Sequence, residues 1–396
     1  MAELPENGAI DDEQLQVLEN AGVLISNDEI IRVDDFIKLT QEAEQYDYAV
    51  ETIEEPLVLL PGLIDAHTHI CFAGSRANDY AMRVAGKSYL DIARSGGGIL
   101  DSVRKTREAT VIELVELLKR RCDRHFKEGV TTCEVKSGYG LSVDDEIKML
   151  EAIQLVNKHH AIDLIPTCLA AHMRPPEFTE SKAYLDTILQ DLLPTIKEQQ
   201  LANRVDIFIE DTAFTETEAI EYLLEAKKMG FDVTVHADQF TTGGSKVAVE
   251  AGALSADHLE ASGEDEITLM RNAGLVATVL PGASLGLGMH YAPARKMLDG
   301  GLCLAIATDW NPGSAPMGDL LLQAALLGAA EKLTTAETLA AITTRAARAL
   351  NLSDRGQLAS GLKADMIAFP TNNYKEILYF QGKMKPSRMW KGGKEV

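Results

Sequence analysis

Short apolar runs alternate with amphipathic stretches along the chain from Leu63 onward. The runs are rich in β-branched residues and are typical of strands, whereas the stretches between them carry apolar residues at helical spacing. Val111, Leu114 and Leu118, for example, fall on one helical face. Eight βα repeats favour a closed, parallel (β/α)8 TIM-like barrel over an open doubly wound sheet. The predicted strands are residues 63–69, 130–136, 163–171, 205–210, 231–237, 254–259, 275–281 and 302–308.

Local signals support this division of the chain. Thr215 with Glu218, and Thr334 with Glu337, have the spacing of capping boxes and predict the starts of two helices. The glycine run at 96–98 lacks the spacing of a phosphate-binding loop, so the sequence does not indicate a nucleotide site. We expect this run to be a flexible or closely approached segment near the mouth of the barrel.

The two ends of the chain have a different pattern from its middle. Residues 22–25 and 29–33 flank a turn signal and predict a hairpin, and residues 365–369 and 388–390 predict further strands. We therefore expect an α/β protein in which both termini together build a small composite β-sandwich domain. The predicted boundaries are 1–60 and 351–396 for the two parts of this domain and 61–350 for the barrel.

Composition narrows the class of partner. The 396 residues include 60 acidic and 38 basic side chains, and the net charge of −22 repels nucleic-acid phosphates and anionic membrane surfaces. The five cysteines form no CxxC pair, so we expect no disulfide framework and a reducing compartment. The acidic start lacks a signal-peptide pattern, and no run of about 18 apolar residues occurs. We therefore predict a cytoplasmic protein without a nucleic-acid or membrane partner.

Four residues at the ends of predicted strands form a candidate metal site. His67 and His69 are two apart at the end of the first strand and face the same side, while His236 ends the fifth strand and Asp309 follows the eighth. A single histidine is more often a hydrogen-bonded core residue than a ligand. Barrel enzymes, however, gather their active sites at the C-terminal ends of the strands. Three imidazoles and a carboxylate suit one Zn2+ or Fe2+/Fe3+ ion, which lowers the pKa of a bound water towards about 7.

Two further strand ends bear on this site. His258 ends the sixth strand and is a candidate fifth ligand, a proton-transfer group beside the metal, or a core histidine bonded to Asp257. Glu210 ends the fourth strand. Related barrel enzymes that bind two metal ions often carry at this position a lysine that bridges the ions. Because this chain has no lysine there, the sequence favours one metal ion. His125 lies among charged residues in a helical pattern, and we expect it to be solvated.

The motifs resemble a known family. Residues 61–69 (PGLIDAHTH) are similar to the opening of the amidohydrolase superfamily. Residues 94–99 (RSGGGI), 134–140 (EVKSGYG) and 307–314 (ATDWNPGS) together resemble the imidazolonepropionase family. The resemblance implies hydrolysis of the lactam C–N bond of 4-imidazolone-5-propanoate to N-formimino-L-glutamate, a step of histidine degradation. It also implies a small-molecule substrate and a homodimer.

The resemblance assigns roles residue by residue. The family's metal ligands correspond to the four residues that strand position selects. Gln239 stands where the family has Glu or Gln. Because an amide side chain cannot act as a general base, we assign that role to Asp309 and His258. The planar guanidinium of Arg76 and the hydroxyl group of Tyr139 can both donate hydrogen bonds to a propanoate carboxylate. The implied metal ligands are His67, His69, His236 and Asp309, the catalytic residues Asp309 and His258, and the substrate contacts Arg76, Tyr139, His172, Gln239, Asn311, Gly313 and Ser314.

The chain departs from the family pattern in three places. Ser75 precedes Arg76 where many relatives have Asp, so we expect a looser arginine. The glycine-rich loop at 282–288 replaces an aromatic-rich segment of the family, so the sequence does not determine the shape of the pocket. The family's first strand is missing, which suggests a truncated or differently started chain. Two rival functions remain: another hydrolase of cyclic amides or aminated heterocycles, and a non-catalytic scaffold, which predicts degraded ligands that this sequence does not have.

Overall fold

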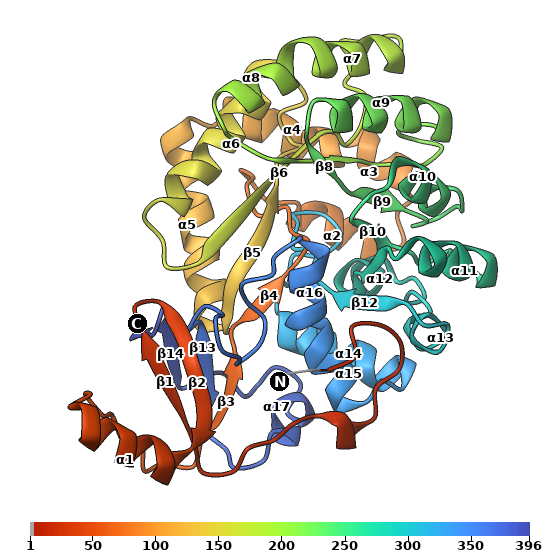
Figure 1. Cartoon of the computed structure of the whole chain (residues 1–396). Coiled ribbons are helices and arrows are strands. Elements are labelled where there is room, and N and C mark those ends of the chain that lie inside the picture. The colour runs from red at the N-terminus through yellow and green to blue at the C-terminus, as the bar shows by residue number, and fades with distance from the viewer. Residues whose placement is uncertain (1–3) are drawn as a thin grey trace.

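The structure is a computed structural model that describes residues 4–396 and contains the predicted barrel (Figure 1). All eight predicted runs contain barrel strands, and β5 and β6 have the predicted bounds. The other strands are shorter than predicted: most end before the predicted residue, and the fifth run is interrupted at Thr234 into β8 and β9. The strands are β4 (Leu63–Asp65), β5 (Val130–Lys136), β6 (Asp163–Ala171), β7 (Arg204–Ile207), β8 (Asp232–Val233), β9 (Val235–Ala237), β10 (Ser255–His258), β11 (Val276–Val279) and β12 (Cys303–Ile306).

Backbone hydrogen bonds close the barrel at two junctions. The parallel sheets β4-β5-β6-β7-β8 and β9-β10-β11-β12 divide the fifth predicted strand between them. At one junction the amide of Ile209 donates to the carbonyl of His236 at 3.2 Å. At the other, the amide of Asp309 donates to the carbonyl of His67 at 3.0 Å. The barrel therefore closes through residues that the sequence predicts as metal ligands.

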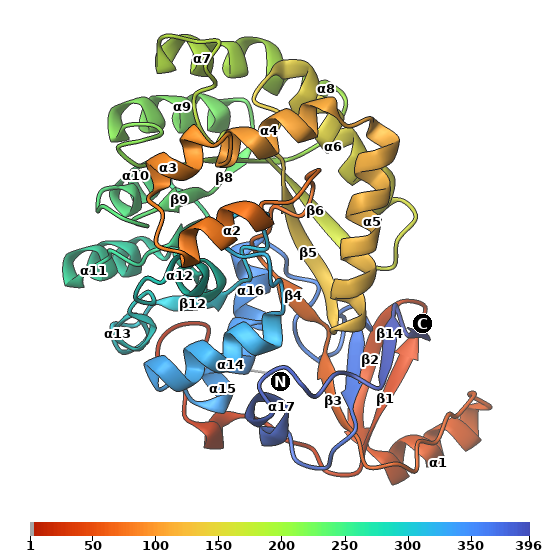
Figure 2. The same ribbon diagram turned by 180° about the vertical axis from the view of Figure 1, so that it is seen from behind.

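Helices surround the strands, and α2, α3 and α4 cross the face seen in Figure 2. Both predicted capping boxes are present, since Thr215 and Thr334 accept hydrogen bonds from the amides of Glu218 and Glu337. The helices are α1 (Phe36–Tyr46), α2 (Ala77–Val84), α3 (Tyr89–Arg94), α4 (Ile99–Glu108), α5 (Val111–Lys127), α6 (Val143–Asn157), α7 (Ser181–Thr187), α8 (Leu193–Glu198), α9 (Glu216–Lys228), α10 (Gly244–Ala251), α11 (Glu264–Ala273), α12 (Pro281–Leu287), α13 (Ala294–Asp299), α14 (Leu320–Glu331), α15 (Thr335–Ala341), α16 (Thr344–Ala349) and α17 (Lys375–Tyr379).

Strands from both ends of the chain form the small β domain below the barrel in Figure 1. The predicted hairpin pairs β1 (Ala21–Ser26) with β2 (Glu29–Asp35), and its Val23 and Ile25 pack against Trp390 of the second sheet. That sheet has the order β15-β14-β13-β3. Its strands are β3 (Val58–Pro61), β13 (Met366–Phe369), β14 (Arg388–Lys391) and β15 (Lys394–Glu395). The composite sandwich is therefore confirmed, while its boundaries stay a prediction.

The start of the described chain packs against the barrel. The amide of Ile10 donates to the carboxylate of Glu337 in α15 at 3.0 Å, just before a 3-10 turn at Asp12–Gln14. Within residues 4–396, no helix combines the length and the apolar character needed to cross a bilayer. All five cysteines are buried free thiols.

The expectation that His125 is solvated is wrong. Its side chain is fully buried, and its Nε2 lies 2.9 Å from the Asp65 carboxylate. The charged neighbours in sequence lie on other faces of α5, whereas His125 continues the buried face formed by Leu114, Leu118 and Cys122. Helical periodicity, rather than the composition around the residue, decides its burial.

Candidate active site

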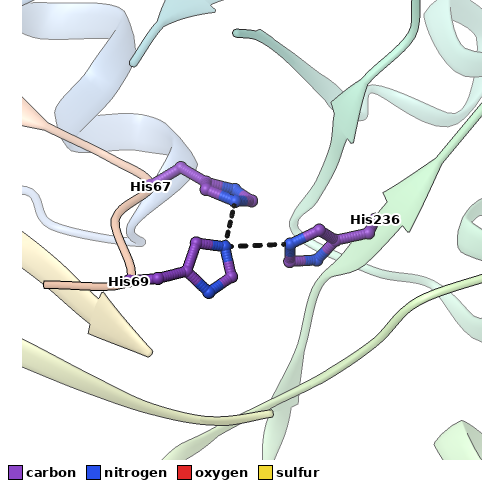
Figure 3. Close-up of side chains that lie close together, drawn as sticks. All are labelled: His67, His69 and His236. Carbon is purple, nitrogen blue, oxygen red and sulfur yellow. Dashed lines mark hydrogen bonds between the residues drawn. The ribbon is translucent and has the colours of Figure 1, made fainter. Parts of the chain in front are cut away.

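Three imidazoles converge at the C-terminal end of the barrel strands, as Figure 3 shows. His67 and His69 lie just after β4, and His236 lies in β9. The Nε2 atom of His69 is 3.2 Å from Nε2 of His67 and 3.3 Å from Nε2 of His236. Asp309 follows β12, and its Oδ1 lies 3.2 Å from Nε2 of His69. The structure thus brings together all four predicted ligands, each at most 3% exposed.

The electrostatic state of this cluster suits a metal ion. Burial lowers the pKa of His69 and of His236 to about 3 and holds the pKa of His67 well below its usual value, so all three imidazoles are neutral at neutral pH. Their Nε2 lone pairs face one another and the Asp309 carboxylate. Three neutral imidazole nitrogens and one carboxylate oxygen form a donor set that fits a divalent ion.

Two buried carboxylates orient the imidazoles from behind. Nδ1 of His67 donates to Oδ2 of Asp257 at 2.6 Å, and Nδ1 of His236 lies 2.9 Å from Oδ2 of Asp206. A proton on each Nδ1 leaves each Nε2 lone pair directed into the cluster, which is the usual arrangement of metal-binding histidines. Nδ1 of His69 has no hydrogen-bond partner among the described residues. Sequence reasoning missed Asp206 and considered Asp257 only as a partner of His258.

A buried lysine lies beneath these carboxylates. Nζ of Lys136, at the end of β5, is 2.8 Å from Oδ2 of Asp206, 2.8 Å from Oε2 of Glu134 and 3.8 Å from Oδ2 of Asp257. Burial alone would lower the pKa of Lys136, but the carboxylates outweigh this effect and raise its pKa. The side chain is therefore an ammonium group that is paired with carboxylates rather than directed at the imidazole cluster.

His258 stands beside the cluster rather than in the core network. Its ring centroid is 5.3 Å from that of His236, and Asp257, the core partner considered for it, binds His67 instead. His258 has a φ of 86°, a left-handed conformation that is strained in a non-glycine residue. Although burial lowers its pKa, the Glu260 carboxylate 3.6 Å away raises the pKa of His258 above its usual value overall.

One cavity of about 740 Å³ joins these groups to the barrel mouth. Every predicted site residue except His67 lines it, so residues from six separate stretches of the chain share one space. The lining includes His69, Arg76, Tyr139, His172, His236, Gln239, His258, Asp309, Asn311, Gly313 and Ser314. Leu287 at the end of α12 and Met289 also line the cavity. The glycine-rich stretch expected to be a loop therefore forms a helix that contributes apolar wall.

Arg76 is held firmly, although Ser75 precedes it. Its Nε donates to Oδ2 of Asp79 at 2.8 Å, and Asp79 is itself 5% exposed and accepts from the amide of Gly98. The expectation of a looser arginine is therefore wrong, because the next turn of chain supplies the missing carboxylate. A Cβ at Gly313 would collide with Nη1 of Arg76. A side chain at position 313 would therefore require the guanidinium to shift from its present place.

Tyr139 and His172 form an aromatic wall near His69. Burial raises the pKa of the Tyr139 phenol, which therefore stays protonated as a donor. Nδ1 of His172 lies 3.0 Å from the carbonyl of Gly138, and burial lowers the pKa of His172 to about 3. The rings of His69 and His172 stack with centroids 5.3 Å apart. This wall suits a flat, neutral ring next to the imidazole cluster.

The loop after β12 ties Asp309 to the predicted substrate loop. Nδ2 of Asn311 donates to Oδ2 of Asp309 at 2.9 Å, while Oδ1 of Asn311 accepts from the amides of Gly313 and Ser314 at 2.7 and 2.8 Å. One asparagine therefore fixes both the carboxylate and the backbone that follows it. Its amide leaves Oδ1 of Asp309 free to face the imidazoles.

Several supporting residues carried no sequence signal that we used. Glu146 in α6 is fully buried and accepts from the amides of Gly138, Gly140 and Leu141, which orders the loop that carries Tyr139. Its signal is an acidic residue within a buried apolar helical face. Glu210 accepts from the amide of Phe240 at 2.7 Å and so holds the loop after Gln239. Arg83 also lines the cavity, and it lies seven residues, about two helical turns, after Arg76 on the same side of α2.

Comparison with known proteins gives the site its context. The amidohydrolase family model matches residues 58–396. Similar curated proteins include imidazolonepropionases from Bacillus mycoides, 41% identical, and Bacillus cereus, 42% identical, with 96% of this chain and 89% of each relative covered. The chain belongs to the amidohydrolase family, among its imidazolonepropionases. It is therefore a hydrolase of small molecules, which excludes a non-catalytic scaffold.

Solved structures share its fold at low sequence identity. The 5-methylcytosine deaminase from Klebsiella pneumoniae has a TM-score of 0.72 and 15% identity over 95% of this chain and 94% of that chain. A mutant atrazine chlorohydrolase from Arthrobacter aurescens, complexed with zinc, has a TM-score of 0.71 and 18% identity over 98% and 92%. Identities this low compare the fold alone. They confirm the fold class over nearly the whole chain.

Proposed function

We propose that the enzyme hydrolyses the lactam C–N bond of 4-imidazolone-5-propanoate to give N-formimino-L-glutamate, in the degradation of histidine. The observation that carries this proposal is one cavity lined both by the guanidinium of Arg76 and by the imidazole cluster. A flat ring with a propanoate arm suits a cavity that offers a cation for the carboxylate and a candidate metal site for the ring carbonyl. The relatives named imidazolonepropionase support the same reaction.

The proposed cofactor is one Zn2+ or Fe2+/Fe3+ ion, held by His67, His69, His236 and Asp309. A bound ion would supply a water that ionises near neutral pH and a Lewis acid for the ring carbonyl. Glu210 supports a single ion, because its carboxylate accepts backbone amides and no lysine stands in its place. Lys136 is paired with carboxylates and is not available as a ligand.

The chain's own groups then move the protons. Asp309 accepts the proton of the attacking water, since its carboxylate faces the cluster and Asn311 holds its second oxygen. His258, with its raised pKa, donates to the oxygen of the ring carbonyl as negative charge develops there. Collapse breaks the C–N bond, and Asp309 or His258 returns a proton to the leaving ring nitrogen. Gln239 orients the ring through its amide.

Arg76 binds the propanoate carboxylate in this proposal, with Tyr139 as a second donor and the backbone of Gly313 and Ser314 beside it. We expect Arg76→Ala to raise KM by about 10- to 100-fold with little change in kcat, because a charge-assisted hydrogen bond is lost equally from ground and transition states. Steady-state kinetics measure this effect. Arg120→Gln, on the outer face of α5, is the matched control. A large fall in kcat with unchanged KM would contradict the assignment.

The function is tested by supplying freshly prepared 4-imidazolone-5-propanoate to the metal-loaded protein and measuring formiminoglutamate. Product well above the spontaneous rate supports the proposal. A parallel assay for ammonia release from cytosine and guanine tests the deaminase alternative suggested by the shared fold. No product from the imidazolone, with release of ammonia from a heterocycle, would assign the site to that alternative.

We further propose a cytoplasmic homodimer without nucleic-acid or membrane partners. The net charge of −22 and the free, buried cysteines support this setting, and the family resemblance supports the dimer.

A further inference from the structure

Two of the three clustered imidazoles share one buried ammonium group behind them. Oδ2 of Asp206, which lies 2.9 Å from Nδ1 of His236, is also the oxygen 2.8 Å from Nζ of Lys136. Oδ2 of Asp257, which accepts from His67 at 2.6 Å, is the oxygen 3.8 Å from the same Nζ. The oxygens that orient the two histidines are therefore the oxygens that face Lys136.

Few other cations lie close enough to replace Lys136 as a partner of these buried carboxylates. Asp206, Asp257 and Glu134 are at most 1% exposed, and buried carboxylates need a paired cation. Among the described residues, the only non-histidine cation within 4.0 Å of Asp206 or Asp257 is Lys136. Of these three carboxylates, only Glu134 lies within 4.0 Å of Arg204, at 3.8 Å. The two histidine partners and Glu134 thus share one ammonium group.

The position of Lys136 in the barrel explains why its side chain reaches both Asp206 and Asp257. Lys136 ends β5, next to β4 and its His67, and it extends across the barrel interior to β7 and β10. It touches none of the four proposed ligands directly in the ion pairs of the described chain. Its charge acts on the three imidazoles through space and lowers their pKa, but its side-chain contacts with the cluster run through the two aspartates.

We propose that Lys136 is a positioning residue for the metal site, which sets the orientation of His67 and His236 together through Asp257 and Asp206. The inference rests on the metal site of the proposed function and goes beyond it, because it assigns the coupling of two ligands to one residue outside the ligand set. The same residue that neutralises the carboxylates also determines where the two Nε2 lone pairs meet.

Zinc affinity tests the inference without reference to substrate. We expect Lys136→Met to weaken Zn2+ binding by about 10- to 100-fold in a chelator-competition titration, the usual effect of losing a partner behind a ligand. The visible spectrum of the Co2+-loaded variant should shift, because the ligand geometry changes. Lys136→Arg should recover part of the affinity. Lys148→Met, which removes a partly buried lysine paired with Asp145 far from the cluster, is the matched control and should bind Zn2+ normally.

A second variant separates positioning from charge balance and from folding. Lys136→Met combined with Glu134→Gln removes one positive and one negative buried charge, so its net charge in the network equals that of the native protein. We expect this double variant to fold, with far-ultraviolet circular dichroism like the native protein, and still to bind Zn2+ weakly. Native Zn2+ affinity in the double variant would overturn the inference and leave the proposed reaction intact. Absence of Zn2+ binding by the native protein would instead refute the metal site itself.

Discussion

Asp309→Asn lowers kcat by about 1,000-fold or more, because the carboxylate is both the proposed proton acceptor and a ligand. Asparagine has nearly the same shape, so the cavity and the loop after β12 keep their form. The amide, however, has no basic oxygen for the proton of the attacking water. Loss of imidazolone absorbance under saturating substrate measures kcat.

Thermal unfolding of the same variant checks that the fold is retained. Burial raises the pKa of Asp309, so the native carboxylate is held at a cost that the neutral amide does not carry. We therefore expect the metal-free variant to be at least as stable as the metal-free native protein. Asp299→Asn, at the exposed end of α13, is the control with unchanged turnover. Native turnover by the purified Asp309→Asn variant would contradict the proposed role of Asp309 in the reaction.

Removal of bound metal abolishes turnover, and added Zn2+ or Fe2+ restores it. The structural reason is the cluster itself, since three neutral imidazoles and a buried carboxylate can neither ionise water nor polarise a carbonyl to the extent that the lactam requires. Dialysis against a chelator, elemental analysis and an assay of each reconstituted sample measure the effect. The reconstitution also distinguishes zinc from iron as the more active ion.

Apo protein that keeps its rate, with no metal by elemental analysis, would contradict this prediction. The stability of the apo protein provides a control for damage by the chelator. Its circular dichroism should match that of the loaded sample, because β4, β9 and β12 are joined by backbone hydrogen bonds that do not depend on an ion. A loss of secondary structure would show that inactivation follows unfolding instead.

The fold could be predicted largely because its strands are local patterns. β5 is a continuous buried run and β6 is buried over its last five residues, and the bounds of both strands match the prediction. That the four candidate ligands lie together could be predicted because strand ends in a barrel meet at one edge, whatever the sequence distance between them. His67 and Asp309 needed no knowledge of side-chain contacts.

The supporting network could not be predicted in the same way. Lys136 and Asp206 are single charged residues within or beside strands, and a charged residue in a strand is usually solvated. Only the closed barrel shows that both face its interior. Asp257 precedes His258, and alternation on a strand would place them on opposite sides. The positive φ of His258 breaks that alternation, so both side chains reach the same region.

The helix α12 shows a second limit. The stretch 281–287 contains two glycines and is typical of a loop, yet it forms α12 because Gly282 and Gly286 pack closely against Thr308, Gln323 and Ser314. A side chain at either glycine would meet these neighbours. Tertiary packing thus overrides the low helix propensity of glycine.

The junction between β4 and β12 links assembly of the chain to its chemistry. The amide of Asp309 binds the carbonyl of His67, so the first and last barrel strands meet through two residues of the proposed ligand set. During synthesis the first of these ligands emerges long before the last. A nascent chain that ends before Asp309 therefore presents an incomplete set, so we expect the proposed site to be complete only after the final βα unit has docked.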